Sequence, residues 1–152
     1  MIRRIVTANN AGGQSYIAAA DIVEERYPWW TFGENRQGPT AADAPPLLPS
    51  TAPGIEPPPG GTRCNFATIQ PWAIRQAEIA AGRFPGLDTN GFHRTATIDY
   101  ILVTEGEVTL LLDLGETVVR AGDMVIQRNT SHAWRVLSDR PVRLWGIMVS
   151  LK

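Results

Sequence analysis

From residue 98 to the C-terminus, the sequence breaks into short apolar segments separated by turn residues. These segments alternate apolar with polar residues or are rich in β-branched residues, and they are 98–104, 107–112, 116–120, 124–127, 132–136 and 142–149. Short segments at this spacing are typical of β-barrels and β-sandwiches, and no interior segment of this half has a helical pattern. We therefore predict an all-β, antiparallel structure, and closure into a barrel would remove its exposed edge strands.

Three further segments precede this region. Residues 62–69 are predicted to form a strand. Residues 73–81 have the alanine-rich composition of a helix, which Gly82 could end. Near the start of the chain, residues 16–26 fit either a strand or a helical turn, and the sequence leaves this choice open.

Prolines divide the chain into two parts. Nine of the 12 prolines lie within residues 28–61, and proline lacks the N–H that ladders and helices need. This stretch is either an extended surface linker or an ordered arm. Its large apolar side chains Trp29, Trp30 and Phe32 favour an arm that packs on the barrel or on a partner subunit. We predict an N-terminal arm with this extended Pro-rich segment over residues 1–61, and a β-barrel over residues 62–152.

The composition excludes several classes of protein. The 152 residues suffice for one domain, and 14 Lys and Arg against 15 Asp and Glu give a net charge of −1, without the basic surface of a nucleic-acid-binding protein. No apolar run approaches the roughly 20 residues that span a bilayer. The first residues lack the apolar stretch of a signal peptide, and the single cysteine, Cys64, fits a reducing compartment. We expect a cytoplasmic protein with neither a nucleic-acid nor a membrane partner.

One candidate group of functional residues precedes and enters the strand at residue 98. His93, Thr95, Thr97 and Asp99 alternate in the sequence, so in an extended chain they point to one face. Asp99 lies in an otherwise apolar strand, where a carboxylate must be paired, hydrogen-bonded or functional because burial of a lone charge is costly. This face is predicted to line a site.

The second histidine, His132, opens another predicted strand far along the chain. Trp134 lies two residues later and shares its face, so it could wall the same site. Ser131 points to the opposite face and does not form a catalytic triad with His132. We predict that His93 and His132 lie close together in the folded chain.

Two stretches of the sequence resemble the motifs of the cupin superfamily. Residues 91–106 resemble the first motif, His-x-His, three or four residues, Glu, six residues and Gly, because six residues separate Asp99 from Gly106. Residues 122–132 resemble the second motif, which begins with Gly-Asp and ends in a histidine. Gln127 and Asn129 occupy the places where that motif usually has Pro and Gly.

This resemblance implies a jelly-roll barrel with a site in its mouth. In metal-binding cupins, two His and one Glu of the first motif and the His of the second bind one divalent metal. His93 and His132 match two of these ligands, Asp99 replaces the Glu, and Thr95 replaces the other His. The resemblance thus implies a two-His-one-carboxylate set, which suits Fe(II) and also accepts Mn, Ni or Zn. A hydrogen-bonded polar cluster and metal-free acid–base chemistry are the open alternatives.

The resemblance extends to small single-domain cupins of small-molecule pathways, among them decarboxylases, dehydratases and isomerases. It implies a lyase-type enzyme for an oxygenated small-molecule substrate, with His93, Asp99 and His132 as catalytic residues. Thr95, Thr97 and Trp134 are predicted to bind the substrate. A metal-dependent oxygenase and a non-catalytic ligand-binding protein are the alternatives. We expect a homodimer without a nucleotide cofactor.

Overall fold

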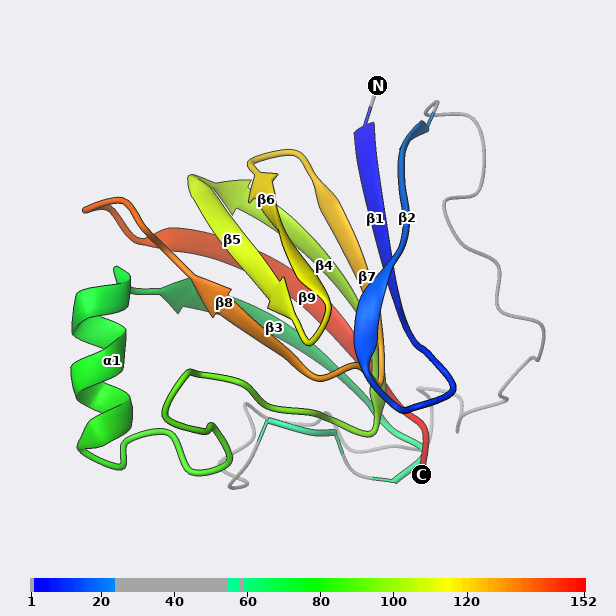
Figure 1. Ribbon diagram of the computed structural model, residues 1–152, viewed down its shortest axis with the longest axis horizontal. Helices are drawn as coiled ribbons and strands as arrows, with labels where there is room; N and C mark the ends of the chain where they lie inside the picture. The colour runs from blue at the N-terminus through cyan, green and yellow to red at the C-terminus, as the bar shows by residue number, and fades with distance from the viewer. Residues whose placement is uncertain (1, 24–54, 58) are drawn as a thin grey trace, which may run out of the picture.

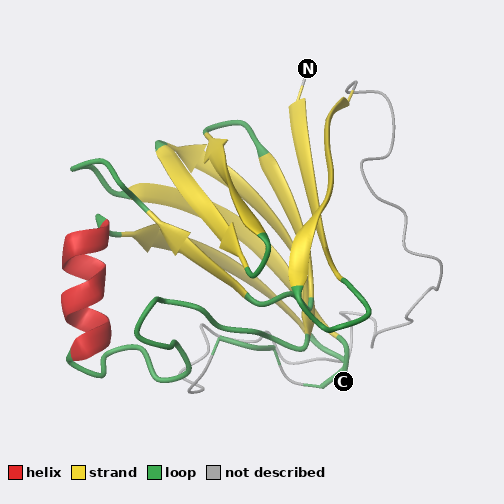
Figure 2. Ribbon diagram, viewed as in Figure 1, coloured by secondary structure: helices red, strands yellow, loops and turns green. Residues whose placement is uncertain are grey.

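The computed structural model describes residues 2–23, 55–57 and 59–152, which form two β-sheets and one flanking helix (Figure 1). Figure 2 shows the helix at one side of the strands. The larger sheet has six strands in the order β2-β1-β7-β4-β9-β3. Its strands are β1 Ile2–Asn9, β2 Ser15–Val23, β3 Thr62–Ile69, β4 Thr97–Glu105, β7 Met124–Arg128 and β9 Val142–Ser150.

The smaller sheet has three strands in the order β6-β5-β8. They are β5 Glu107–Leu112, β6 Gly115–Arg120 and β8 His132–Arg135. Within each sheet the ladders between the named strands are antiparallel, apart from the ladder of β1 with β7 in the larger sheet. In that parallel ladder Ile5 lies opposite Val125.

The two sheets enclose one apolar core. Val103 and Val125 of the larger sheet and Leu110 and Val119 of the smaller sheet are fully buried in a common cluster. Side chains of a strand alternate between its two faces, so each sheet directs one face toward this cluster. The arrangement confirms the all-β jelly-roll barrel that the sequence predicts.

Helix α1, Trp72–Ala80, lies beside strand β8 (Figure 1). The Trp72 N–H donates to the Val136 carbonyl oxygen at 2.8 Å, and the Arg135 guanidinium lies 4.5 Å from the centroid of a Trp72 ring. Gly82 follows the helix with a φ of 72°, a left-handed conformation that favours glycine. These contacts hold the helix at the edge of the barrel, where it borders the site described below.

The predicted elements agree closely with the observed ones. Residues 62–69 and 107–112 form strands with the predicted bounds, and residues 16–26 adopt the strand alternative as far as β2 extends. Residues 28–54 of the Pro-rich segment, with Trp29, Trp30 and Phe32, lie outside the described residues, so the packing of this arm stays a prediction. The division at residue 61 stays a prediction, and β1 and β2 lie in the same sheet as β7. In the described part of the chain, no helix has the length and apolar character needed to cross a bilayer.

Candidate functional site

A cavity of about 160 Å³ lies inside the barrel; we call it the inner cavity. Four polar side chains line it, from β4, β7, β8 and the segment before β4: Asp99, Gln127, His132 and His93. The other lining residues are mostly apolar, among them Ile101, Trp134, Leu144 and Met148. A small apolar cavity with a few convergent polar groups is the usual form of a small-molecule site.

The two histidines are neighbours. The backbone N–H of each donates to the carbonyl oxygen of the other at 3.0 Å, which makes an isolated antiparallel bridge between His93 and His132. Their ring centroids are 4.3 Å apart. The prediction that these residues lie close together is confirmed, because the segment before β4 is tied to the start of β8.

His132 is a neutral imidazole with a defined tautomer. Its side chain is buried, and Nδ1 lies 2.9 Å from the Thr130 carbonyl oxygen. A carbonyl oxygen only accepts, so the proton lies on Nδ1 and the Nε2 lone pair is free to accept a hydrogen bond. Burial, reinforced by the nearby His93, lowers the pKa of His132 to about 3, against the opposing effect of the Thr130 hydrogen bond.

His93 is also held in its neutral form near pH 7. Burial is the main cause of its lowered pKa, the nearby Gly91 backbone acts in the opposite direction, and the positive charge of Arg75 adds to the lowering. The Nδ1 atom of His93 is buried and has no hydrogen-bond partner within the described residues. The site therefore contains two uncharged imidazoles side by side.

Asp99 and Gln127 form a cross-strand pair between β4 and β7. Both are buried, at 5% and 1% exposure, and both line the inner cavity. Asp99 Oδ1 and both amide atoms of Gln127 have no hydrogen-bond partner within the described residues. Burial raises the pKa of Asp99 to about 6, against a hydrogen bond from Thr97, and the negative charge of Glu56 raises it further.

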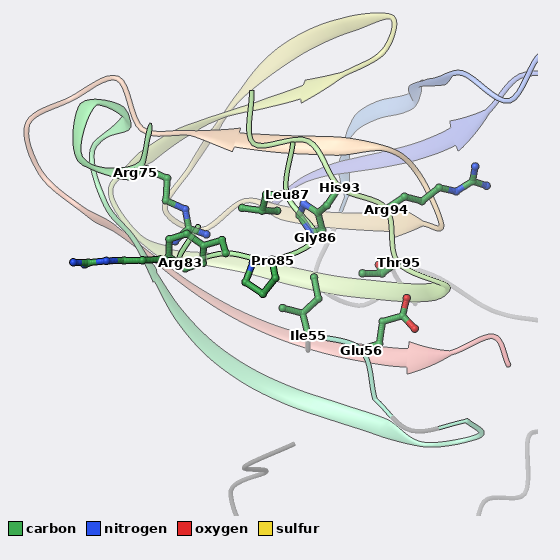
Figure 3. A pocket seen from close by; sticks show the side chains of 11 residues that line it. Ile55, Glu56, Arg75, Arg83, Pro85, Gly86, Leu87, His93, Arg94 and Thr95 are labelled. Atoms are coloured by element: carbon green, nitrogen blue, oxygen red, sulfur yellow. The ribbon is translucent and has the colours of Figure 1, made fainter. Parts of the chain in front are cut away.

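A second pocket, of about 590 Å³, adjoins the inner cavity; we call it the outer pocket (Figure 3). It is lined by Arg75 of α1, by residues 83–87 after the helix, and by residues 55–56 and 93–95. His93 and Ile55 line both spaces. A ligand that occupies the outer pocket is therefore next to His93 and to the inner cavity.

The other predicted site residues take different positions. Trp134 lines the inner cavity, with its ring edge-on to His132 at a centroid distance of 6.2 Å. Thr95 is buried and lines the outer pocket beside His93. Thr97 lines neither space; its hydroxyl lies 2.7 Å from that of Thr95, and its proximity to Asp99 lowers the pKa of that carboxyl. The regular strand begins only at Thr97, so the alternation expected from His93 to Asp99 does not extend through Thr95.

The metal predicted for His93, Asp99 and His132 requires three side chains within bonding distance of one ion. The three residues line one cavity, but among residues 2–23, 55–57 and 59–152 no three His, Cys, Asp or Glu side chains gather closely enough to hold a metal ion. Thr95, at the place of the missing ligand, has its hydroxyl near Thr97. The residues as they stand do not form the expected ligand set, and a bound Fe, Mn, Ni or Zn stays a prediction.

Two residues of the second motif have roles that the sequence did not reveal. Asn129 adopts a φ of 52°, the left-handed conformation for which the family motif uses glycine. Gln127, at the place of the usual proline, is buried and lines the inner cavity. A signal for it exists in the sequence: like Asp99, it is a polar residue within an apolar strand.

Several curated proteins are similar to this chain, although no protein-family model matches it. Phomopsin biosynthesis cluster protein C' of Diaporthe leptostromiformis is 36% identical over 101 residues, which are 66% of this chain and 43% of that protein. Cupin-domain-containing oxidoreductase virC of Hypocrea virens is 36% identical over 64 residues, 40% of this chain and 33% of that protein. Cupin-domain-containing oxidoreductase srdD of Neurospora crassa is 45% identical over 51 residues, 33% of this chain and 26% of that protein. The chain thus spans less than half the length of these relatives.

A solved structure is also similar: the Cupin 2 conserved barrel domain protein from Salinispora arenicola has a TM-score of 0.44 and 14% identity over 69% of this chain and 72% of that chain. The family assignment depends on the sequence relatives that are named as cupin-domain proteins. It also depends on the barrel, in which the two motifs bring His93, Asp99 and His132 to one cavity. The chain belongs to the cupin superfamily.

Proposed function

We propose that the inner cavity is the active site of a lyase-type enzyme that moves a proton on a small oxygenated organic substrate. The observation that carries this proposal is that Asp99 and two neutral imidazoles line one largely apolar cavity. A carboxyl group with a pKa near 6 is populated in both protonation states around neutrality. Such a group exchanges protons with a substrate more readily than an ordinary aspartate does.

Asp99 is assigned as the proton-transferring residue. In a dehydration, its carboxylate takes the proton from a carbon next to a carbonyl group, and the resulting carboxyl returns this proton to the departing hydroxyl, which leaves as water. In an isomerisation, the same proton returns to a different carbon. Both reactions leave Asp99 in its starting state, so neither needs a further reactant.

Gln127 and His132 are assigned to the oxygen atoms of the substrate. The Gln127 amide N–H has no acceptor within the described residues, so it is available to donate to the carbonyl oxygen on which negative charge develops when the neighbouring carbon loses its proton. The low pKa of His132 makes Nε2 a weak base but leaves it a hydrogen-bond acceptor for a substrate hydroxyl. The two residues would orient the substrate around Asp99.

The sequence relatives support a small-molecule enzyme. Two of them carry the names of phomopsin biosynthesis cluster proteins, and others are named as oxidoreductases. These names place relatives of this chain in the production of small organic molecules. They favour catalysis over ligand storage, and they do not distinguish a lyase from an oxygenase.

The oxidoreductase names favour a second candidate, a metal-dependent oxygenase. This alternative requires His93, His132 and Asp99 to gather around a metal, which would involve movement of at least one of these side chains from its position here. The two candidates differ in their consumption of oxygen and in their dependence on added Fe(II). Both properties are measurable with one set of candidate substrates.

The experiment uses the full chain with a series of β-hydroxy carbonyl compounds in D₂O, followed by NMR. A lyase or isomerase exchanges the proton next to the carbonyl for deuterium and forms product without oxygen uptake, and D99N abolishes both. Oxygen uptake that depends on Fe(II) would instead favour the oxygenase. Absence of exchange and of product with the whole series would contradict the proposed lyase function.

A further inference from the structure

Among the charged residues that line the outer pocket, Arg75 has the surroundings most suited to binding a ligand. Its side chain is half-buried and is directed from α1 into the pocket, whereas Arg83 and Arg94 extend away on opposite sides (Figure 3). The Arg75 guanidinium carbon lies 3.4 Å from the centroid of the Phe84 ring. It also raises the local positive potential at His93.

The other charges around the pocket have partners. Arg83 pairs with Glu78 at 3.4 Å, and Arg94 Nε donates to Asn129 Oδ1 at 2.9 Å. The carboxylate of Glu56 accepts from Lys152 Nζ at 2.6 Å and from a backbone N–H at 3.0 Å. The acidic groups near Arg75 are thus already engaged by other donors.

The backbone N–H of Arg75 donates to the Pro71 carbonyl oxygen within the helix, but the Arg75 guanidinium has no hydrogen bond or ion pair to any residue that the structure describes. Its pKa is lowered, mainly by burial and against the negative charge of Glu78, because burial disfavours the charged form. Stacking on Phe84 covers one face of the guanidinium but leaves the N–H groups at its edges free, since these lie in the plane of the group. The edge of a guanidinium fits a carboxylate through two parallel hydrogen bonds.

We propose that Arg75 binds a carboxylate group of the substrate in the outer pocket, and that it makes the enzyme selective for anionic substrates. A carboxylate at Arg75 lies on the side of His93 that faces the outer pocket, and the remainder of the molecule extends past His93 toward Asp99. The inference deepens the proposed function, because it names the charge of the molecule that enters the cavity. The reaction at Asp99 and the binding at Arg75 are separable by mutation.

The test measures binding by isothermal titration calorimetry at neutral pH. The probes are benzoate, 3-phenylpropanoate and hexanoate, each paired with its uncharged primary amide. We expect at least one acid to bind the unmodified chain more tightly than its amide. R75Q should weaken binding of that acid about 10- to 100-fold and leave its amide unchanged, as expected for a hydrogen-bonded charge pair.

R83Q is the matched control, because Arg83 lines the same pocket but is paired with Glu78 and directed away. It should bind both members of each probe pair as the unmodified chain does. R75K, which keeps the charge and loses the planar fork, should bind the acid with intermediate affinity. Circular dichroism confirms that each variant is folded; if R75Q does not fold, R75K and the loss of acid binding on addition of sodium chloride provide the test.

Three results would overturn the assignment of Arg75. The acids could bind no more tightly than the amides, R75Q could retain full affinity for the acid, or none of the probes could bind saturably. The proposed reaction is tested separately by D99N, which should lose turnover while its affinity for the acid remains. A D99N variant that keeps turnover contradicts the role of Asp99 and leaves the assignment of Arg75 intact.

Discussion

His93 and His132 are joined by two backbone hydrogen bonds of 3.0 Å, one in each direction, and their imidazole rings lie against each other. The bridge fixes the segment before β4 onto the start of β8, and it sets the ring of His93 at the boundary of the two pockets. A histidine held by its backbone in this way loses little conformational freedom when a ligand binds. The backbone of the candidate site is therefore largely formed before any ligand binds.

The two nitrogens of His132 are predicted to have separate roles. In H132N, the amide nitrogen replaces Nδ1 as the donor to the Thr130 carbonyl, but nothing replaces Nε2. We expect H132N to fold and to lose about tenfold in kcat/KM, the worth of one hydrogen bond to the substrate. H132Q keeps a polar atom near the position of Nε2 but loses the donor to the Thr130 carbonyl, so it should be less stable than H132N. Equal activity of H132N and the unmodified chain would contradict the role of Nε2.

Asp99 is predicted to destabilise the folded chain as the pH rises. Its pKa is about 6 in the folded chain, against 3.8 for an ordinary exposed aspartate, so the folded state holds the proton more tightly. The stabilisation from neutral Asp99 is complete below pH 4 and is lost between pH 4 and 6, by about 3 kcal/mol in the free energy of unfolding. D99N lacks this loss, so its stability relative to the unmodified chain should increase from pH 4 to 6.

His132 has the opposite effect over an overlapping range. Its folded pKa of about 3 lies below the ordinary 6.5, so the unfolded chain binds the proton first and stability falls as the pH drops from 6.5 toward 3. The two effects oppose each other in the unmodified chain between pH 4 and 6. We expect urea unfolding to show that, as the pH falls from 6 to 4, the free energy of unfolding decreases more steeply in D99N than in the unmodified chain and increases in H132N. Parallel curves for all three proteins would contradict both assignments.

Gln127 is predicted to reduce stability in favour of function. Its carboxamide is buried without a partner among the described residues, which is costly for a polar group. Q127M should raise the free energy of unfolding by about 1–3 kcal/mol and remove most of the activity. Q76M, at an exposed position of α1, is the control and should change neither the free energy of unfolding nor the activity. A destabilised Q127M would mean that the Gln127 amide stabilises the barrel.

Gly106 and Gly115 provide a matched pair for the turns of the barrel. Both have a positive φ, 85° and 99°, but a Cβ at Gly106 would lie 3.0 Å from Val142 Cγ2, whereas one at Gly115 meets nothing within 4 Å. G115A should cost about 1 kcal/mol through backbone strain alone. G106A should cost about 1–3 kcal/mol more through the clash, with activity retained in both, as thermal unfolding and a turnover assay would show. Equal losses of stability would contradict the close approach of Val142.

The sequence predicts the strands well because each sheet has one face on the core. In β5, Val108, Leu110 and Leu112 are buried as their alternation indicates, and the predicted bounds are the observed ones. The pairing of His93 with His132 also follows from the sequence, through the motifs that they carry. Local pattern is sufficient for these features because it reflects the period of a strand.

Arg75 illustrates what the sequence does not predict. Its helix has an ordinary amphipathic composition, and its position next to His93 arises only when α1 docks beside β8. The same holds for β1, since no local signal marks residues 2–9 as a parallel partner of β7. Contacts of this kind depend on the packing of whole elements, which the period of one segment does not encode.

The parallel ladder of β1 with β7 has a consequence for the way the chain acquires its structure. Ile5 pairs with Val125, so β1 leaves the ribosome long before the strand that it joins. Until then β1 has only its hairpin partner β2, and an isolated two-stranded hairpin is marginally stable in water. Ladders that close such long loops are slow to form and expose strand edges to aggregation in the meantime. The nascent chain is therefore expected to depend on chaperones more than its small size suggests.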